Sequence, residues 1–447
     1  MPAATLAGKI QRGLGSGFLD ALEQPRSEVE PIVLGCLADD PRVNAQDEAR
    51  DLYYARLMLE LGIDEAHVGT ILARDPDRDG MTTRDWLPVG VLGLLARSGR
   101  PEAVRILRDY IGSGLWWSEA LYHLSATGDP AALHGLDAVL ARRFADDPDE
   151  LASETGPWDE EPWRSWGERG PLATLAPVVE AKVDQPSVDL DALDARSLFG
   201  LVTGFGWRED PATDLLVDRI RGGSAKDRRV VEDALRGQDR ELAARAVRVL
   251  GALGDPAIVP VGEQILMDIG DGFAAPGSRL RPIILRGFEG LPAVTALEVA
   301  RRWRDTSDYR GTVLATSLLA LHATLEDLPW TVESIRRAAA NDDDLYVYAR
   351  ILPRFPGTGP FDGFEEIYRT YVPTCCRGHL LAAMSVADPT FGDTLAMECL
   401  YDCEPITRTA AARTITLTPD VRRRLRAIAD DPLEEDEVRA AASARLA

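Results

Sequence analysis

Four of the five cysteines and one of the five histidines lie close together near the end of the sequence: Cys375, Cys376, His379, Cys399 and Cys403. Thiolates and imidazoles bind zinc in tetrahedral sites. If helices near residues 374–386 and 391–402 form a hairpin, Cys376 and His379 approach Cys399 and Cys403, and a zinc site results. The sequence has no Cys-x-x-Cys pair. Because free cysteine is also a common small core residue, core packing is the alternative.

Three aspartates at alternate positions, Asp75, Asp77 and Asp79, are followed by Gly80. This pattern resembles the start of an EF-hand calcium loop, in which alternate carboxylates wrap a hard cation and the glycine permits a sharp turn. The twelfth position, where a bidentate glutamate closes such a loop, is Trp86, and only Asp85 beside it could substitute. Calcium binding is one interpretation, and an acidic loop between two helices is the other.

Signatures of nucleophilic catalysis and of phosphate binding are missing from the sequence. It has no Gly-x-Ser-x-Gly elbow and no Gly-x-x-x-x-Gly-Lys loop. The remaining histidines, His67, His123, His134 and His322, fall within helical patterns. The glycine-rich stretch at residues 13–17 follows no expected strand, and we interpret it as a flexible hinge. We expect no catalytic residues and no cofactor.

An acidic insertion occupies residues 146–170, where Pro148, Gly156, Pro157, Pro162 and Gly170 leave no uninterrupted helix of useful length. Nine acidic residues and two arginines give it a net charge of −7. Aromatic rings among carboxylates could bind a basic partner, with the rings as anchors and the acids steering the encounter. The alternative is that the tryptophans fasten the insertion to the rest of the protein. The candidate partner-binding residues are Trp158, Asp159, Glu160, Glu161, Trp163 and Trp166.

Short amphipathic helices must position these candidates. Apolar residues recur at spacings of three and four, as in Leu242, Val247 and Leu250. Similar corners separate the helices, at residues 128–130 and 254–256 (both Gly-Asp-Pro) and more loosely at 99–101 and 387–389. Glycine ends one helix, aspartate caps the next, and proline fits its first turn. Helix therefore follows helix with a corner of two or three residues.

One stretch of small residues and arginines is the most regular, residues 243–260 with the sequence AARAVRVLGALGDPAIVP. Residues 408–413 (RTAAAR) and 438–442 (VRAAA) are weaker versions. The pattern resembles the HEAT repeat, especially the short variant first known from phycobilisome lyases. The resemblance implies an all-α fold, an α-solenoid of HEAT-like antiparallel helix pairs, and no chemistry of its own. It also implies that each arginine meets the acidic corner of an adjacent repeat.

The pattern divides the chain into an N-terminal helical array at residues 1–145, the inserted loop at 146–170 and a C-terminal array at 171–447. The expected helices lie near residues 28–38, 45–61, 65–74, 84–98, 101–111, 115–127, 130–145, 171–183, 191–204, 211–221, 225–236 and 240–253, and continue as short pairs to residue 446.

Composition limits the partners and the compartment. The formal net charge of −23 repels nucleic acid and anionic membranes, so we expect neither as a partner. Apolar runs such as residues 89–96 are too short to span a bilayer, and residues 1–24 contain no secretory core. Five cysteines without an export signal indicate reduced thiols. We expect a cytoplasmic protein without disulfides.

The function that these observations favour is a non-catalytic interaction scaffold, because solenoids present long binding surfaces. We expect a protein or peptide partner that carries a basic region. The alternative is an enzyme, or an accessory subunit of one, that acts on a small molecule or peptide in a groove of the solenoid. Fold alone does not decide between them.

Overall fold

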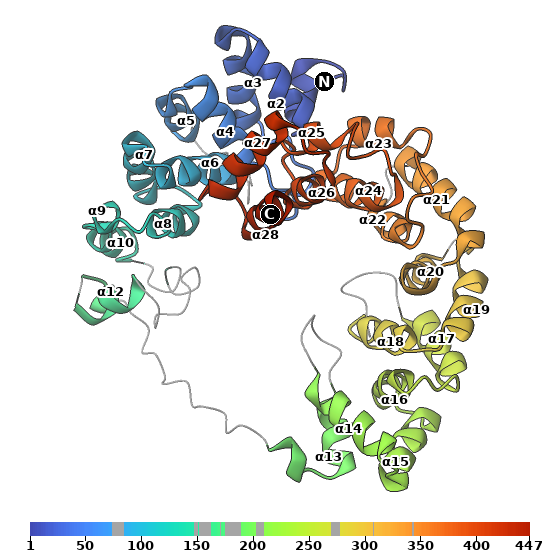
Figure 1. The fold of residues 1–447 in the computed structure, drawn as a ribbon. Helices are drawn as coiled ribbons and strands as arrows, with labels where there is room; N and C mark the ends of the chain where they lie inside the picture. Colours follow the sequence, from blue (N-terminus) through green and yellow to red (C-terminus); the bar gives the residue numbers. More distant parts are fainter. Residues whose placement is uncertain are drawn as a thin grey trace. The chain divides into compact units, whose positions relative to one another are not determined.

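The structure is a computed structural model, and every regular element in the part of the chain that it describes is a helix. The expected α-solenoid is confirmed, since successive helices pack against their neighbours in the chain (Figure 1). Within the described ranges, no helix is both long and apolar enough to cross a bilayer. The described residues are 1–73, 85–146, 151, 162–169, 171–174, 189–202, 210–269, 278–306, 308–341 and 344–447.

The chain forms two compact units. The terminal unit combines Met1–Val183 with Thr358–Ala447, and the middle unit is Asp184–Gly357. This division differs from the one that we expected at residues 146–170, because residues near the two ends of the sequence pack on each other. A local pattern of helices and corners carries no information about such long-range contacts.

The terminal unit contains an N-terminal and a C-terminal part. Its N-terminal part comprises α1 (Leu6–Gln11), α2 (Gly15–Glu23), α3 (Arg26–Ala38), α4 (Asp51–Leu61), α5 (Glu65–Leu72), α6 (Trp86–Arg97), α7 (Pro101–Ile111), α8 (Trp117–Ser125), α9 (Pro130–Leu133), α10 (Leu136–Arg143), α12 (Trp163–Arg169) and η2 (Pro171–Thr174). Its C-terminal part comprises α23 (Phe364–Thr370), α24 (Thr374–Ala387), α25 (Ala396–Cys399), α26 (Pro405–Thr414), α27 (Pro419–Asp430) and α28 (Asp436–Leu446).

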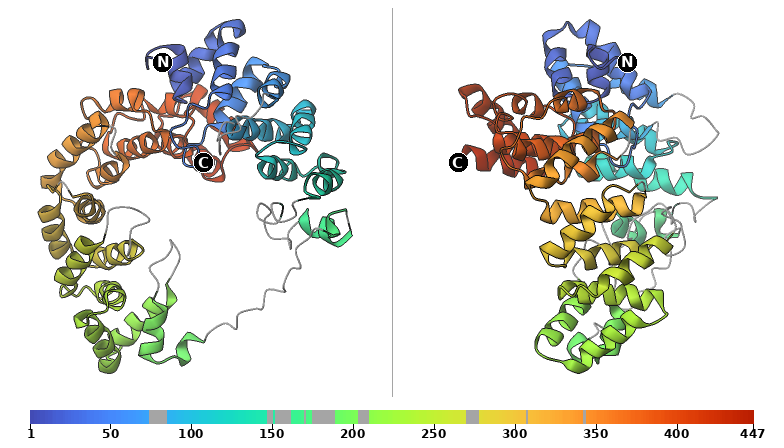
Figure 2. Two further views of the ribbon diagram at one scale, coloured as in Figure 1. Left: turned by 180° about the vertical axis from the view of Figure 1, so that it is seen from behind. Right: turned by 90° about the vertical axis from the view of Figure 1, so that its right-hand side faces the viewer.

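The middle unit is a stack of helix pairs. Contacts join α14 to α16, α16 to α18 and α18 to α20, which follow one another in Figure 1, and Figure 2 shows the same stack from two further sides. Its elements are η3 (Leu190–Ala192), α13 (Ala195–Leu201), α14 (Pro211–Arg221), α15 (Ala225–Arg236), α16 (Arg240–Ala252), α17 (Ile258–Asp268), α18 (Leu280–Glu289), α19 (Ala293–Trp303), α20 (Tyr309–His322), η4 (Leu325–Asp327), α21 (Leu328–Asn341), α22 (Tyr346–Ala349) and η5 (Leu352–Arg354).

The expected corners are confirmed where glycine, aspartate and proline follow each other. Gly128 and Gly254 have φ angles of 69° and 74°, in the left-handed region that glycine tolerates best. The carboxylates of Asp129 and Asp255 then accept hydrogen bonds from backbone N–H groups two residues on, at 2.9 and 3.0 Å. At each corner the aspartate thus satisfies one of the backbone N–H groups that follow it. Pro130 begins α9, whereas α17 begins at Ile258, two residues after Pro256.

Two corrections concern glycines. The stretch at residues 13–17 is not a hinge, because residues 15 to 23 form α2 and its first glycines are buried. A Cβ on Gly15 would overlap the backbone of Glu398 near α25, so this glycine permits close packing. The helix expected at residues 130–145 is interrupted at Gly135, whose φ of 75° separates α9 from α10.

The core of the N-terminal part of the terminal unit is one continuous apolar cluster. It extends from Ile10 on α1 to Leu172 on η2 and includes Cys403 and Leu433 from the C-terminal part. The described part of the insertion contributes to it, since Leu151 and Trp163 are buried members of the cluster. The insertion also contains a helix of seven residues, α12, which we had not expected. Packing against the apolar cluster stabilises a helix too short to persist alone.

Glycines allow an especially close approach of α16 and α18 in the middle unit. A Cβ on Gly251 would overlap the carbonyl group of Gly287, and a Cβ on Gly287 would overlap the backbone of Val247. Side chains cannot fill the space between these two helices, so their backbones are in direct contact. Only glycine fits at this crossing.

Gly251→Ala is therefore expected to lower the free energy of unfolding by about 1–3 kcal/mol, the usual cost of overpacking. Gly200→Ala is a matched control on α13, because its Cβ would meet nothing within 4 Å. Both changes gain the same helix propensity, so the control should be neutral or slightly stabilising. Urea denaturation of the two variants measures the difference, and equal midpoints would contradict the close crossing.

Candidate functional site

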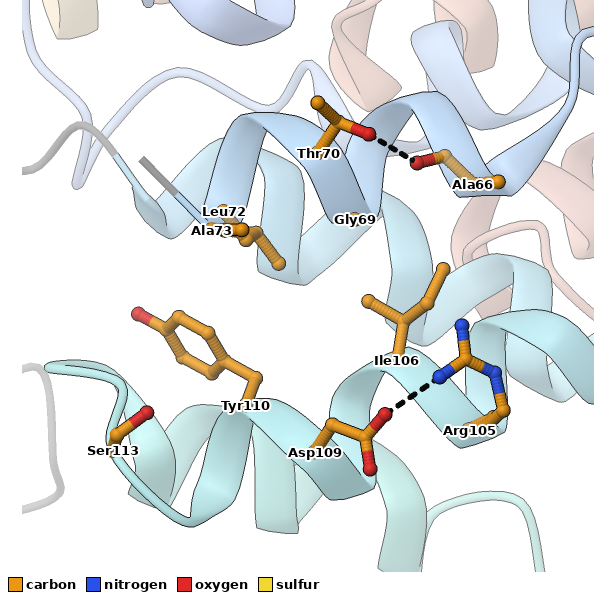
Figure 3. A pocket seen from close by; sticks show the side chains of 10 residues that line it. All are labelled: Ala66, Gly69, Thr70, Leu72, Ala73, Arg105, Ile106, Asp109, Tyr110 and Ser113. Atoms are coloured by element: carbon orange, nitrogen blue, oxygen red, sulfur yellow. Dashed lines mark hydrogen bonds and ion pairs between the residues drawn. The ribbon is translucent and has the colours of Figure 1, made fainter. Parts of the chain in front are cut away.

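A groove between α5 and α7 is the first candidate site. It encloses about 440 Å³ and lies between one face of each helix (Figure 3). Its apolar wall is formed by Gly69 and Leu72 of α5 with Ile106 and Tyr110 of α7. The small size of Gly69 keeps the groove open, since a Cβ there would lie only 3.2 Å from the Ile106 side chain. The other lining residues are Ala66, Thr70, Ala73, Arg105, Asp109 and Ser113.

Charged residues of α7 form one edge of this groove. Arg105 lies between two carboxylates, 2.7 Å from Glu102 and 2.6 Å from Asp109. The hydrogen bond from Arg105 lowers the pKa of Glu102, so this carboxylate is ionised at neutral pH. Arg105 and Asp109 line the groove and offset each other's charge, and Glu102, which lies on α7 outside the lining, adds one negative charge nearby. A positive group that approaches the groove meets a weakly attractive edge.

Tyr110 forms a rigid wall of the groove. Its hydroxyl donates to the Asp85 carboxylate at 3.1 Å and accepts from the backbone N–H of Trp116 at 3.2 Å. Burial, the larger effect, and the neighbouring Asp85 both raise the pKa of this phenol. The hydroxyl is thus neutral and doubly bonded, and Arg105 and Asp109 are paired with each other. The groove is suited to holding an apolar side chain.

The second candidate is a buried ionic cluster, where the N-terminal and C-terminal parts of the terminal unit meet. Arg50, Arg377 and Arg408 are among the largest fully buried side chains. We define the cluster as these arginines with the residues that surround them, Glu48, Thr374, Asp402, Glu404 and Glu434. Desolvated charges are tolerated only when they are paired and hydrogen-bonded.

Each arginine of the cluster has its own partners. Arg50 lies 2.7 Å from Glu48 and also donates to the carbonyl of Gln11. Arg377 donates to the carbonyl of Arg12 at 2.6 Å and lies 3.5 Å from Asp402.

Arg408 shows the geometry that the HEAT resemblance implied. Its guanidinium grips both oxygens of Glu434, at 3.1 and 2.7 Å, and Glu434 lies at the acidic corner before α28. Arg245 differs, because it donates to the backbone carbonyl of Gly200 and pairs with Glu241 of its own helix. The arginine-to-corner contact is therefore present in one of these two repeats.

Burial and pairing act in opposite directions on the carboxyls of the cluster. For Glu434, burial is the largest single effect and opposes ionisation, but Arg408, Arg56 and the hydrogen bonds to the carboxylate together outweigh it and the pKa is lowered. For Glu48, Arg50 and the hydrogen bonds from Asn44 and Thr374 likewise outweigh burial together, and the pKa is lowered. For Glu404, burial dominates and raises the pKa to about 7. Glu48 and Glu434 are thus charged, whereas Glu404 titrates near neutrality.

The cysteines and histidine predicted to bind zinc do not form a metal cage. Within the described residues, no group of three or more His, Cys, Asp or Glu side chains could hold a metal ion. Cys399 and Cys403 are completely buried, and burial raises the pKa of both thiols well above the usual value. Cys375 and Cys376 are neighbours with their sulfurs 3.8 Å apart, and His379 is exposed. Core packing, the alternative, describes the two buried thiols.

The calcium candidates Asp75, Asp77 and Asp79 lie outside the described residues. The neighbouring positions are described and have other partners. Asp85, the substitute for the closing glutamate, accepts the hydrogen bond of Tyr110. Trp86 stacks on Trp116 with the ring centres 5.2 Å apart.

The structure describes two of the insertion's three tryptophans, Trp163 and Trp166. Trp163 is only 9% exposed and contacts Trp117 edge to face, with 6.3 Å between ring centres. Trp166 is half-buried and packs on Trp163 at 5.5 Å. Trp163 has the fastening geometry that we gave as the alternative to an exposed anchor. The candidates Trp158, Asp159, Glu160 and Glu161 lie outside the described residues.

Sequence reasoning missed the groove and most of the ionic cluster. A signal for the groove exists, since Ala66 and Gly69 of α5 and Ala73 directly after it are small residues at helical spacing. No comparable signal marks the ionic cluster, because Glu48 and Thr374 are 326 positions apart in the sequence.

No family model and no curated protein matches the chain. Among solved structures, an engineered protein studied by the Northeast Structural Genomics Consortium aligns with 97% of this chain and 97% of its own. The sequence identity is 16% and the TM-score is 0.26. A similarity this low indicates neither a shared fold nor a shared function.

Trp163→Ala is expected to lower the free energy of unfolding by about 3–5 kcal/mol, because it leaves a large cavity beside Trp117 and Trp166. Tyr122→Ala on α8 is the control, since that ring is 66% exposed and its loss should change stability little. Chemical denaturation of the full chain compares the two. A Trp163→Ala variant as stable as the wild type would show that the ring is not a structural anchor.

Proposed function

We propose that this chain is a non-catalytic scaffold of the HEAT type, which binds a protein or peptide carrying a basic region. The observation that carries the proposal is the groove between α5 and α7. Its apolar wall offers a site for one aliphatic or aromatic side chain, and the carboxylate of Glu102 adds a negative charge beside the balanced pair of Arg105 and Asp109. Grooves between helices with apolar walls and polar edges are common binding sites.

The distribution of charge supports a basic partner. In the ionic cluster, the three buried arginines are balanced by Glu48, Asp402 and Glu434. The cluster is thus close to neutral, and the formal charge of −23 belongs to the rest of the chain. An excess of negative charge speeds the encounter with cationic segments and disfavours the encounter with anionic segments.

The insertion is the second part of the proposed binding surface. We assign Trp163 to anchoring, because it is buried against Trp117. We propose Trp158, Asp159, Glu160 and Glu161 as residues that contact the partner, on the basis of their composition. In this proposal, the ring supplies contact area and the carboxylates supply attraction.

Filling the groove should abolish retention of the partner. Ala66→Trp adds a large ring at an exposed lining position, whereas Ala138→Trp adds the same ring at an exposed position of α10. Affinity capture from native lysate with the wild-type chain and both variants, followed by mass spectrometry, measures retention. A stoichiometric partner should remain with the wild type and Ala138→Trp, be lost from Ala66→Trp, and be released by salt.

Crosslinking identifies the contact itself. The captured partner should crosslink to α5 or α7 through a segment rich in lysine or arginine. Equal retention by Ala66→Trp and Ala138→Trp would eliminate the groove as the binding site. A partner that binds through an acidic segment, or that resists salt, would contradict the proposed charge recognition.

A further inference from the structure

One threonine joins two glutamates across the junction of the terminal unit. The hydroxyl oxygen of Thr374, the first residue of α24, is 3.0 Å from the Glu48 carboxylate. The same oxygen is in hydrogen-bond contact with the carboxyl of Glu404, which precedes α26. All three groups are buried. Glu48 belongs to the N-terminal part of the unit, and the other two belong to its C-terminal part.

Hydrogen counting shows that this bridge needs an additional proton. A threonine hydroxyl has one hydrogen to donate, and an ionised carboxylate can only accept. Two ionised carboxylates therefore cannot both bond to one hydroxyl. If one carboxyl is protonated, it donates to the threonine oxygen, and the threonine donates to the other carboxylate.

The surroundings decide which carboxyl holds the proton. Glu48 accepts from the backbone N–H groups of Val43 and Asn44, at 2.8 and 2.9 Å, and from Arg50 at 2.7 Å. These donors stabilise its ionised form. Among the described residues, no arginine lies within ion-pair distance of Glu404, so the proton is expected there.

We propose that Glu404 carries a buried proton that closes the junction, so that the terminal unit is held by a pH-sensitive clasp. Its bonds run from the Glu404 carboxyl to the Thr374 hydroxyl, from that hydroxyl to the Glu48 carboxylate, and from Arg50 to Glu48. Loss of this proton gives Glu404 a negative charge, so that the Thr374 hydroxyl then lies between two negative carboxylates, Glu404 and Glu48. The N-terminal and C-terminal parts then repel each other at a buried contact.

The charged and titratable groups around Glu404 come from every element of the junction. Burial is the largest effect on the pKa of Glu404 and raises it, as does negative charge on Asp402 and Glu48. The hydrogen bond with Thr374 and the charge of Arg377 act in the opposite direction, and the net shift is upward. The groups are Glu48 and Arg50 from the N-terminal part, Tyr368 on α23, Cys375 and Arg377 on α24, Asp402 and Cys403 beside Glu404, and Arg408 on α26.

The sign of the pH dependence follows from linkage. The folded-state pKa of Glu404 is about 7, above the value of about 4.3 for an unfolded glutamate. Glu404 makes its full contribution to the free energy of unfolding at a pH below its pKa in the unfolded state. This contribution falls as the pH rises toward the pKa in the folded state and levels off above that pKa. Between about pH 6 and about pH 8.5, the folded state should therefore lose about tenfold in its equilibrium against the opened state.

Hydrogen exchange of the full chain tests the clasp. The backbone N–H of Cys403 donates to the carbonyl of Gly13 at 2.9 Å, across the same junction. Its protection, corrected for intrinsic exchange, should fall about tenfold between about pH 6 and about pH 8.5 in the wild type. In Glu404→Gln, a neutral amide donates to Thr374 at every pH, so this loss should disappear. Glu366→Gln, an exposed control on α23, should behave like the wild type.

A second pair of variants covers the case in which Glu404→Gln does not fold. Thr374→Ser keeps the hydroxyl and should keep both the pH response and the infrared band of a protonated carboxyl. Thr374→Val removes the hydroxyl and should shift that band. An unchanged band in Thr374→Val, a wild type without pH response, or a Glu404→Gln variant that keeps the wild-type response would each overturn the proposal.

Discussion

The buried guanidinium of Arg377 joins the two parts of the terminal unit. A buried guanidinium is tolerated only where carboxylates and carbonyls are at hand to accept its hydrogen bonds. Arg377 takes its acceptors from both parts, whereas Arg50 and Arg408 find theirs within their own part. Arg377 donates to the carbonyl of Arg12, and Thr374 bonds to Glu48, so each part supplies what the other lacks. Removing one partner leaves a desolvated group unpaired, which costs more than the pair itself contributes. This mutual dependence makes distant segments one unit.

Local physics predicted the helices well. The helices expected at residues 101–111, 211–221 and 225–236 agree with α7, α14 and α15, since caps, prolines and apolar spacing act within a few residues. Predictions were wrong where glycine had a different role. At Gly15, the missing side chain permits close packing and not flexibility, and at Gly135 it permits a left-handed turn within an expected helix. Composition alone does not distinguish these uses.

The candidate sites were much less predictable, because they depend on segments far apart in the sequence. The HEAT resemblance pointed to Arg408 and implied that it meets an acidic corner of the adjacent repeat. Its partner Glu434 lies at such a corner. Nothing in the sequence connects Glu48 with Thr374, since that contact exists only after the ends of the chain have docked. The groove likewise exists only because two helices pack with a space between them. A sequence pattern describes the face of each helix separately and does not show how the two faces meet.

The position of the middle unit within the chain determines how tension would travel through the molecule. Residues 184–357 are inserted between the two parts of the terminal unit, and both parts are fastened to each other by the ionic cluster. A force that pulls the first and last residues apart acts in series on the contacts at this cluster. The middle unit lies outside that path and bears load only after the cluster has separated. It is mechanically shielded by the segments on either side of it in the sequence.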